Sequence, residues 1–283
     1  MRQAFRMRPW VFPPEPQAIR EIFERAGEER RFAKGAFMPH GGKGPDAVVG
    51  LLTAGLATVS AVDPRGTPHV FGLIAPGRSM GDLSALNPHR VNVEMAFLRP
   101  STVLVLPRAA FLQALRSDVQ LMEIYADLAI LKEESALEGM LARFTLELEE
   151  RLRVFLLAVI TSFGELRPDD WNLCPLGLTV TEAAHFLSAD RSWVSTKLNA
   201  WVKAGDAKKD GRRLYVHGRI FESVRDWGGG APAGLKAEPT PSEHYAELAR
   251  NSPEDRRGRA EAPGRVQFTR TVEHSTAADG KTV

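Results

Sequence analysis

Apolar residues recur with two different periods along the chain, and the change of period divides it into blocks. Between residues 31 and 116, short apolar runs alternate with glycine- and proline-containing segments, which is typical of short strands joined by turns. Over residues 91–98 large apolar side chains fall at every second position, at Val91, Val93, Met95 and Phe97, as in a half-buried strand. Strands this short and regular predict a β-roll or small barrel.

Turn residues set the predicted limits of these strands. Residues 63–66 read Asp-Pro-Arg-Gly, with proline second and glycine fourth, which suits a type I turn. The flanking runs, 47–62 and 67–74, are therefore expected to pair. A second turn is predicted at Pro76-Gly77.

From Ser117 the period becomes helical. Leu121, Ile124, Leu128 and Leu131 follow the three-and-four spacing of a coiled-coil seam, which predicts a helix that pairs two subunits. The stripe continues less cleanly through Leu137, Met140 and Leu141. An amphipathic helix packed on its own core would give the same stripe. Gly139 and Thr145 are candidate breaks before a further helix over residues 146–163.

The region after residue 168 predicts a helix-turn-helix. Thr179 followed three residues later by Glu182 fits a capping box at the start of the first helix. A turn over 188–190 leads to a second helix, Arg191 to Lys203, which Asp190 can cap and Gly205 ends. The Asp210-Gly211 pair then favours a tight hairpin, so the region reads as a winged helix.

Charge supports this interpretation. The whole chain carries a net charge of only +2, so any affinity for nucleic acid must come from a local patch. Residues 191–225 hold nine basic and three acidic residues. Such a concentration predicts contact with phosphate groups.

The two ends of the chain differ from the middle. Residues 1–30 form a lead-in with a short helix expected from Pro16 to Arg25. Residues 228–283 hold few large apolar side chains and are expected to form a disordered tail. No apolar run is long enough to cross a bilayer, and no secretory signal is evident. The single cysteine, Cys174, is expected to be a small buried side chain in a cytoplasmic protein.

The order of these features resembles the Crp/Fnr family. The landmarks are Gly55, Pro76-Gly77, Gly81-Asp82, Arg90 six residues before Ala96, Pro107-Arg108, and the runs 179–182 and 191–195. The resemblance implies an α+β protein with an N-terminal double-stranded β-roll of jelly-roll type, a long dimerisation helix and a C-terminal winged helix-turn-helix. The corresponding segments are 31–116 for the sensor roll, 117–143 for the dimerisation helix and 144–227 for the DNA-binding domain.

The same resemblance implies roles for individual residues in binding double-stranded DNA. Arg191, Ser192 and Thr196 fall at the family's base-reading positions, and the phosphate contacts fall at Thr179, Thr181, Ser195, Arg212 and Arg213. Ser192 and Thr196 replace the family's common glutamate and arginine. Since those two side chains read cytosine and guanine, the operator is expected to differ from the family's usual one.

In the roll, the resemblance implies an effector site at Gly81, Asp82 and Arg90. The hydroxyl-bearing residue that follows the arginine in the family is replaced by Val91-Asn92, so cyclic AMP is not expected to bind. Some other small molecule could occupy the same roll, or Arg90 could be a solvated loop charge. A regulator of this type would be a homodimer, and it would contact RNA polymerase if it activates transcription.

Other classes of function remain as alternatives. His40, His69 and His89 raise a haem or metal site, although no two of them stand at ligand spacing on one element. The sequence has no nucleophile-elbow, P-loop, Rossmann or metal-ligand motif, so an enzyme is not expected. The remaining alternative is a ligand-binding or scaffold protein that has kept the fold and lost specific DNA binding.

Overall fold

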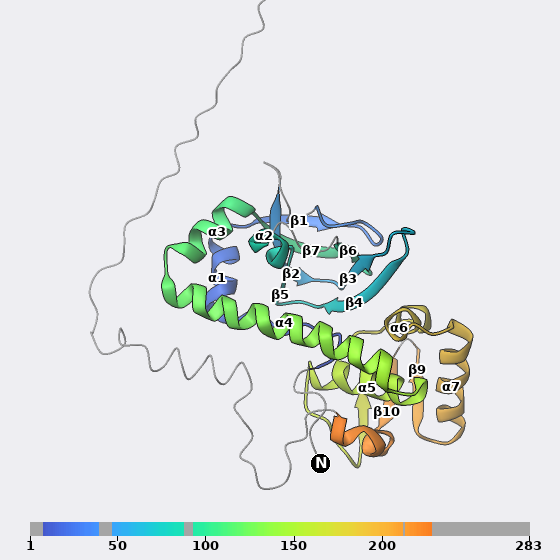
Figure 1. Ribbon diagram of the computed structural model, residues 1–283. Coiled ribbons are helices and arrows are strands. Elements are labelled where there is room, and N and C mark those ends of the chain that lie inside the picture. Colours follow the sequence, from blue (N-terminus) through green and yellow to red (C-terminus); the bar gives the residue numbers. More distant parts are fainter. Residues whose placement is uncertain (1–7, 40–46, 88–92, 212, 228–283) are drawn as a thin grey trace, which may run out of the picture. The chain divides into compact units, whose positions relative to one another are not determined.

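The computed structural model describes residues 8–39, 47–87, 93–211 and 213–227 (Figure 1). Several residues and segments singled out in the sequence therefore lie outside the described residues: His40, His89, Arg90, Val91, Asn92, Arg212 and the segment 228–283.

Two antiparallel sheets form the N-terminal roll (Figure 1). The first has the strand order β1-β7-β2-β5, and the second has the order β4-β3-β6. Their bounds are β1 Glu28–Phe32, β2 Val48–Ala54, β3 Ala57–Val62, β4 Pro68–Ile74, β5 Arg78–Met80, β6 Val93–Phe97 and β7 Ser101–Pro107. In β6 the side chains of Val93, Met95 and Phe97 are buried and those between them are half-buried, which confirms the predicted alternation.

The turn after β3 forms as predicted. The Asp63 carboxylate accepts hydrogen bonds from the amides of Arg65 and Thr67, and Gly66 takes a positive φ of 81°. The prediction that the whole run 47–62 pairs with 67–74 is wrong, because Gly55 at φ 102° breaks that run into β2 and β3. β3 alone pairs with β4, whereas β2 belongs to the other sheet, between β7 and β5.

Helices cover the outer face of the four-stranded sheet. They are α1 Gln17–Ala26, α3 Arg108–Arg116 and the first half of α4 Val119–Thr145, with the short α2 Asp82–Leu86 nearby. Phe23, Phe111 and Tyr125 pack there against Val49 and Leu51 of β2. The lead-in helix therefore forms within one residue of its predicted start, and it contributes to the core of the roll.

Helix α4 is continuous through one of its predicted breaks. Gly139 lies inside the helix, and a Cβ atom there would lie 2.6 Å from Cδ1 of Trp10. Glycine is thus required at this position because the indole ring of the lead-in packs directly on the helix backbone. The second predicted break is confirmed, since the helix ends at Thr145 before α5 Leu148–Thr161.

The stripe predicted to pair two subunits is divided between two faces of the helix, and only its first part faces inward. Leu128 is fully buried with Phe111 and Tyr125, and Leu121 and Ile124 pack partly against the same cluster. The second part of the predicted stripe, Leu137, Met140 and Leu141, is exposed on another face together with Ile130 and Phe144. Both sets of apolar residues have helical spacing, so the sequence pattern does not distinguish them. Tertiary packing decides which set the roll covers.

The C-terminal part is a winged helix, as predicted. It consists of α5, β8 Trp171–Leu173, α6 Val180–Leu187, α7 Arg191–Lys203, β9 Ala207–Asp210, β10 Arg213–His217 and the 3-10 segment Gly218–Trp227. The wing hairpin gains a third strand that was not predicted, since β8 pairs with β10. None of the described helices is both long and apolar enough to cross a membrane.

Candidate nucleic-acid interface and effector pocket

The first helix of the helix-turn-helix begins with the predicted capping box. The amide of Glu182 donates to Oγ1 of Thr179 at 3.2 Å, and the amide of Thr179 donates to Oε2 of Glu182 at 2.8 Å. Ser188 then takes a left-handed conformation with φ 52°, which turns the chain toward α7. Asp190 stands at the N-cap of α7, but among the described residues its side chain accepts no capping hydrogen bond, so that part of the prediction is wrong.

The two helices share an apolar core. Ala183, Ala184 and Phe186 of α6 belong to the same buried cluster as Val194 and Leu198 of α7. Val194 and Leu198 therefore face inward as predicted. The small Ala184 lets the helices approach closely, so α6 and α7 pack as one unit.

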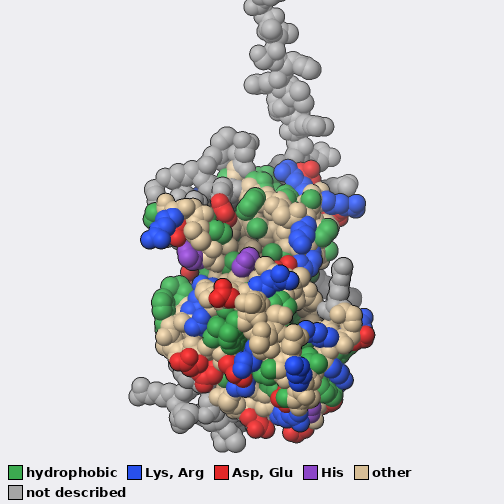
Figure 2. All heavy atoms as spheres, turned by 90° about the vertical axis from the view of Figure 1, so that its right-hand side faces the viewer, with side chains coloured by type: hydrophobic (Ala, Val, Ile, Leu, Met, Phe, Trp, Pro, Cys, Tyr) green, Lys and Arg blue, Asp and Glu red, His purple; other side chains and the backbone are tan. Residues whose placement is uncertain are grey.

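The predicted DNA-contacting residues lie on the solvent side of this core. The exposed ones are Thr179, Thr181, Arg191, Ser192, Thr196 and Arg213, whereas Ser195 is half-buried. Ser192 and Thr196 are four residues apart and so share a face of α7. Figure 2 looks onto the side of the molecule that carries α6 and α7, and Lys and Arg side chains are spread over it among acidic ones.

Some of the basic residues counted in the sequence are already engaged. Lys197 pairs with Glu149 of α5 at 2.5 Å, and Arg219 pairs with Asp206 at 2.6 Å. The Lys208 ammonium lies 4.2 Å from the centre of the Trp171 ring, over which it makes a cation–π contact. Within the described part of the chain, Arg191, Lys203 and Arg213 have no ion-pair partner, so the positive surface is smaller than the sequence count suggests.

One contact between α7 and the wing was missed from the sequence. Nζ of Lys209 donates to Oδ1 of Asn199 at 3.0 Å. Asn199 follows Ser192 by seven residues, and this spacing places both on one face of a helix. The sequence could therefore have placed Asn199 on the exposed face of α7. This hydrogen bond ties the wing to the exposed face of α7.

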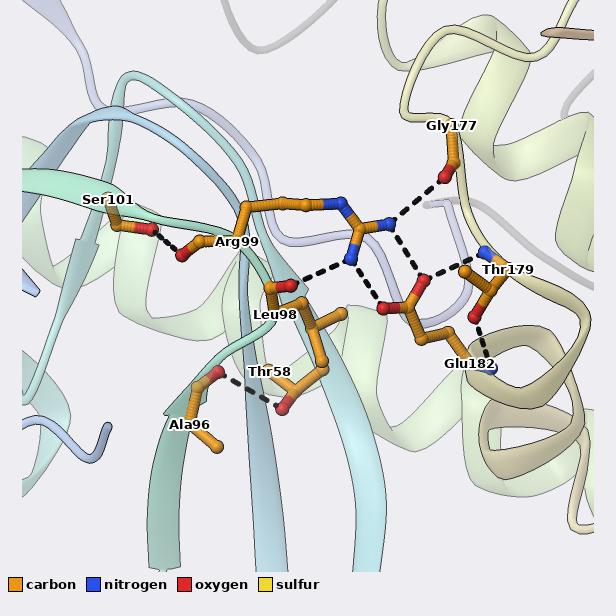
Figure 3. A network of polar contacts seen from close by, with 8 residues as sticks. All are labelled: Thr58, Ala96, Leu98, Arg99, Ser101, Gly177, Thr179 and Glu182. Atoms are coloured by element: carbon orange, nitrogen blue, oxygen red, sulfur yellow. Dashed lines mark hydrogen bonds and ion pairs between the residues drawn. The ribbon is translucent and has the colours of Figure 1, made fainter. Parts of the chain in front are cut away.

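An ion pair joins the roll to the start of α6 (Figure 3). Arg99, in the turn between β6 and β7, donates from its two terminal nitrogens to the two carboxylate oxygens of Glu182 at 2.5 and 2.8 Å. It also donates to the carbonyl of Gly177 at 3.0 Å. Burial raises the pKa of Glu182, but the bonds from Arg99 and Thr179 outweigh burial and lower that pKa below its ordinary value.

The end of α6 is held by two further arginines. Arg143 of α4 donates to the carbonyl of Phe186 at 3.0 Å and also to the carbonyl of Val70 in β4. Arg151 of α5 donates to the carbonyl of Leu187 at 2.7 Å. These guanidinium groups satisfy carbonyls that a helix leaves unpaired at its C-terminus.

A small pocket in the roll lies at two of the predicted effector residues. Gly81 and Asp82 line it together with apolar side chains of β4 and β6 and with Lys132 and Ala136 of α4. Its volume is about 20 Å³. A cavity of that size accommodates about one water molecule.

Asp82 belongs to a buried charged cluster rather than projecting into solvent. Its carboxylate accepts from the hydroxyl of Tyr125 at 2.9 Å and from Nζ of Lys132 at 2.7 Å. Lys132 also pairs with Glu15 and bonds to Ser79, each at 2.7 Å. Burial raises the pKa of Asp82, but the Lys132 ammonium and the hydrogen bonds from Lys132, Tyr125 and Ser79 lower it below its ordinary value.

The other candidate chemistry finds little support among the described residues. His69 lies in the turn after β3, with Nε2 3.2 Å from Asp63, and no group of three potential ligands that could hold a metal occurs in the described ranges. Cys174 is buried, as expected, and burial raises the pKa of its thiol to about 12. A thiol that stays protonated is a poor nucleophile.

Comparison with known proteins agrees with this architecture. The model of the cyclic nucleotide-binding domain family matches residues 29–118. No curated protein matches the sequence significantly.

Three solved structures illustrate the match in fold. FixK2 from Bradyrhizobium japonicum is 17% identical, with a TM-score of 0.60 over 73% of this chain and 100% of its own. A CooA mutant from Carboxydothermus hydrogenoformans is 17% identical, with a TM-score of 0.55 over 71% of this chain and 87% of its own. A CRP-family transcriptional regulator from Thermus thermophilus is 19% identical, with a TM-score of 0.52 over 75% of this chain and 100% of its own.

These matches cover 71–75% of this chain, which is more than the roll alone contains. The chain therefore contains a cyclic nucleotide-binding domain at residues 29–118 and has the α+β fold of the Crp/Fnr-type transcription regulators.

Proposed function

We propose that the protein is a homodimeric transcription regulator whose roll senses a small effector and whose winged helix binds an operator in double-stranded DNA. The observation that carries this proposal is the exposed face of α7. Arg191, Ser192 and Thr196 stand there on a helix that is packed from behind by α6 and flanked by a basic hairpin. This is the geometry with which a recognition helix enters the major groove.

The exposed apolar stripe of α4 supports a homodimer. Ile130, Leu137 and Phe144 are 57%, 55% and 81% exposed, and they are spaced by seven residues. A seven-residue repeat on an exposed helix face is the pattern of a two-stranded coiled coil. Two copies joined there would present two recognition helices to the half-sites of one operator.

The effector site is proposed at the pocket beside Gly81 and Asp82. The pocket has a volume of about 20 Å³ and is open on one side, so an effector larger than water would either extend out of its opening or widen it. Arg90 is also proposed as a contact for the effector, and cyclic AMP is not expected to bind. A regulator that binds DNA would act in the cytoplasm and, as an activator, would contact RNA polymerase. Catalysis is not part of the proposal.

The experiment is selection of genomic fragments on the purified full-length protein, followed by mobility-shift titrations of the best fragment and of a scrambled duplex. Specific affinities are typically about 10³-fold or more above non-specific ones. Equal affinity for both duplexes at every salt concentration would contradict the proposal. That result would favour a ligand-binding or scaffold protein that has lost specific DNA binding.

A further inference from the structure

Helix α6 is held at both ends by side chains from outside the winged helix. At its start, Arg99 from the β6–β7 turn makes a bidentate pair with Glu182, with two hydrogen bonds between the guanidinium and the carboxylate (Figure 3). At its end, Arg143 from α4 bonds to the carbonyl of Phe186 and, with the same nitrogen, to that of Val70 in β4. Position and tilt of α6 thus depend on the roll and on α4.

The elements that supply these contacts also line the pocket in the roll. β6 contributes Val93 and Met95, and Arg99 follows the end of this strand by two residues. β4 contributes Phe71 and Ile74, and α4 contributes Lys132 and Ala136. Ala136 and Arg143 are seven residues apart, which is two turns of one continuous helix.

We propose that the Arg99–Glu182 pair is a latch through which the pocket in the roll controls the position of α6, with Arg143 as the pivot at the other end. The proposal rests on the proposed function for its biological meaning. Filling the pocket beyond its volume of about 20 Å³ presses on β4, β6 and α4, and close-packed walls transmit displacement. A shift of β6 then moves the Arg99 turn, and α7 follows α6 through their shared core.

The chemistry of the pair suits a switch with two positions. Two parallel N–H···O bonds fix both the distance and the direction between guanidinium and carboxylate. The Glu182 side chain is only 10% exposed, so its carboxylate needs the arginine as partner. A small displacement of the turn that carries Arg99 therefore either moves α6 with it or breaks the pair, and intermediate positions are disfavoured.

The test measures hydrogen exchange in the full-length protein without DNA or effector. Ala136→Leu fills the pocket and stands in for an occupant. Val59 of β3 also lines the pocket, and Val59→Ile fills it with one added methylene group. Both are made in the native background and in Arg99→Gln/Glu182→Gln. The double glutamine variant removes the ion pair without leaving an unpaired buried carboxylate, and glutamine preserves the capping box.

In the native background, we expect pocket filling to change the exchange rates of the amides in residues 176–190 by at least about threefold. In the double glutamine background, the same substitutions should still change exchange in the strands of the roll and at the end of α6 that Arg143 holds, whereas the response of residues 176–183 should be lost. Arg30→Gln, which removes an exposed pair with Glu28, is the matched control and should preserve the full response.

Two results would overturn the latch. One is an equal response of residues 176–183 with and without the Arg99–Glu182 pair, and the other is no response of these residues although exchange in the roll changes. If the Ala136→Leu protein does not fold, Val59→Ile gives the same comparison. Because no DNA is present, loss of the proposed DNA binding would leave this measurement unchanged, so the two proposals fail separately.

Discussion

At the scale of single residues, arginines join segments that are distant in the sequence. Arg99 connects the roll to the start of α6, and Arg143 and Arg151 close its end. A guanidinium group suits these places because it stays charged when partly buried and donates several hydrogen bonds in fixed directions. Arg191, by contrast, faces solvent, where the same donors are available to a ligand.

Arg191→Ala should weaken binding to the selected operator by about 1–3 kcal/mol and weaken binding to scrambled DNA much less, because a bidentate contact to guanine carries sequence information. Arg213→Ala should weaken both complexes similarly and reduce the slope of the salt dependence by about one. Salt titrations of both variants on both duplexes measure this. Equal losses for Arg191→Ala on the two duplexes would show that Arg191 contacts only phosphate.

Gly139→Ala should destabilise the fold by about 1–3 kcal/mol, as overpacking of a close contact does. The added Cβ would lie 2.6 Å from Cδ1 of Trp10, and that ring is fully buried against Phe155. Gly164→Ala is the control, since a Cβ there has no described atom within 4 Å. Urea denaturation compares the two. A Gly139→Ala protein as stable as the control would show that Trp10 can move aside.

At the scale of elements, α4 has two apolar faces with different partners. One face, which carries Tyr125 and Leu128, packs on Phe111 of α3, and the other exposes Leu137 and Phe144. The helix also carries Lys132 into the buried cluster with Glu15 and Asp82. The same element thus borders the core, the pocket and the proposed subunit interface.

Substitutions on the two faces should separate stability from dimerisation. Leu128→Ala should cost about 2–5 kcal/mol of folding free energy, because it leaves a cavity in the core. Leu137→Glu should leave the fold intact and weaken the dimer, because it places charges in the proposed seam. Sedimentation at micromolar concentration and thermal unfolding measure the two effects. A native protein that sediments as a monomer, or a Leu137→Glu variant as dimeric as the native protein, would contradict the seam.

At the scale of the whole molecule, buried charges tie together the lead-in, the roll, α4 and the winged helix. Glu15 of the lead-in meets Asp82 of the roll through Lys132, and Glu182 of α6 meets Arg99. Removing one member of such a pair leaves an uncompensated buried charge. The stability of the molecule is therefore expected to depend on pH.

The sign follows from Asp82 and Glu182, whose pKa values are both lowered in the folded protein. Their stabilisation is fully present above the unfolded carboxylate pKa, about 4, and is lost as the pH falls through the lower folded values. Unfolding free energy should therefore decrease below about pH 5. The Arg99→Gln/Glu182→Gln variant should show a shallower decrease than the native protein in urea titrations between pH 3 and 7. An identical decrease in both would exclude Glu182 as a contributor.

The sequence by itself determined the features that depend on neighbours along the chain. The capping box at Thr179 and Glu182, the limits of α7 and the turn at Asp63 all formed as predicted. Each rests on hydrogen bonds or backbone preferences within a few residues, so local composition is sufficient to specify it. The order of such features was also enough to indicate the fold.

Only the tertiary structure decided which surfaces meet. The partners Arg99 and Glu182 are 83 residues apart, and Lys132 is 117 residues from Glu15. The inward face of α4 and the third strand of the wing, β8, likewise depend on what lies opposite them. No periodicity encodes such contacts, because burial and charge pairing are properties of neighbours in space, and the folded chain alone brings those neighbours together.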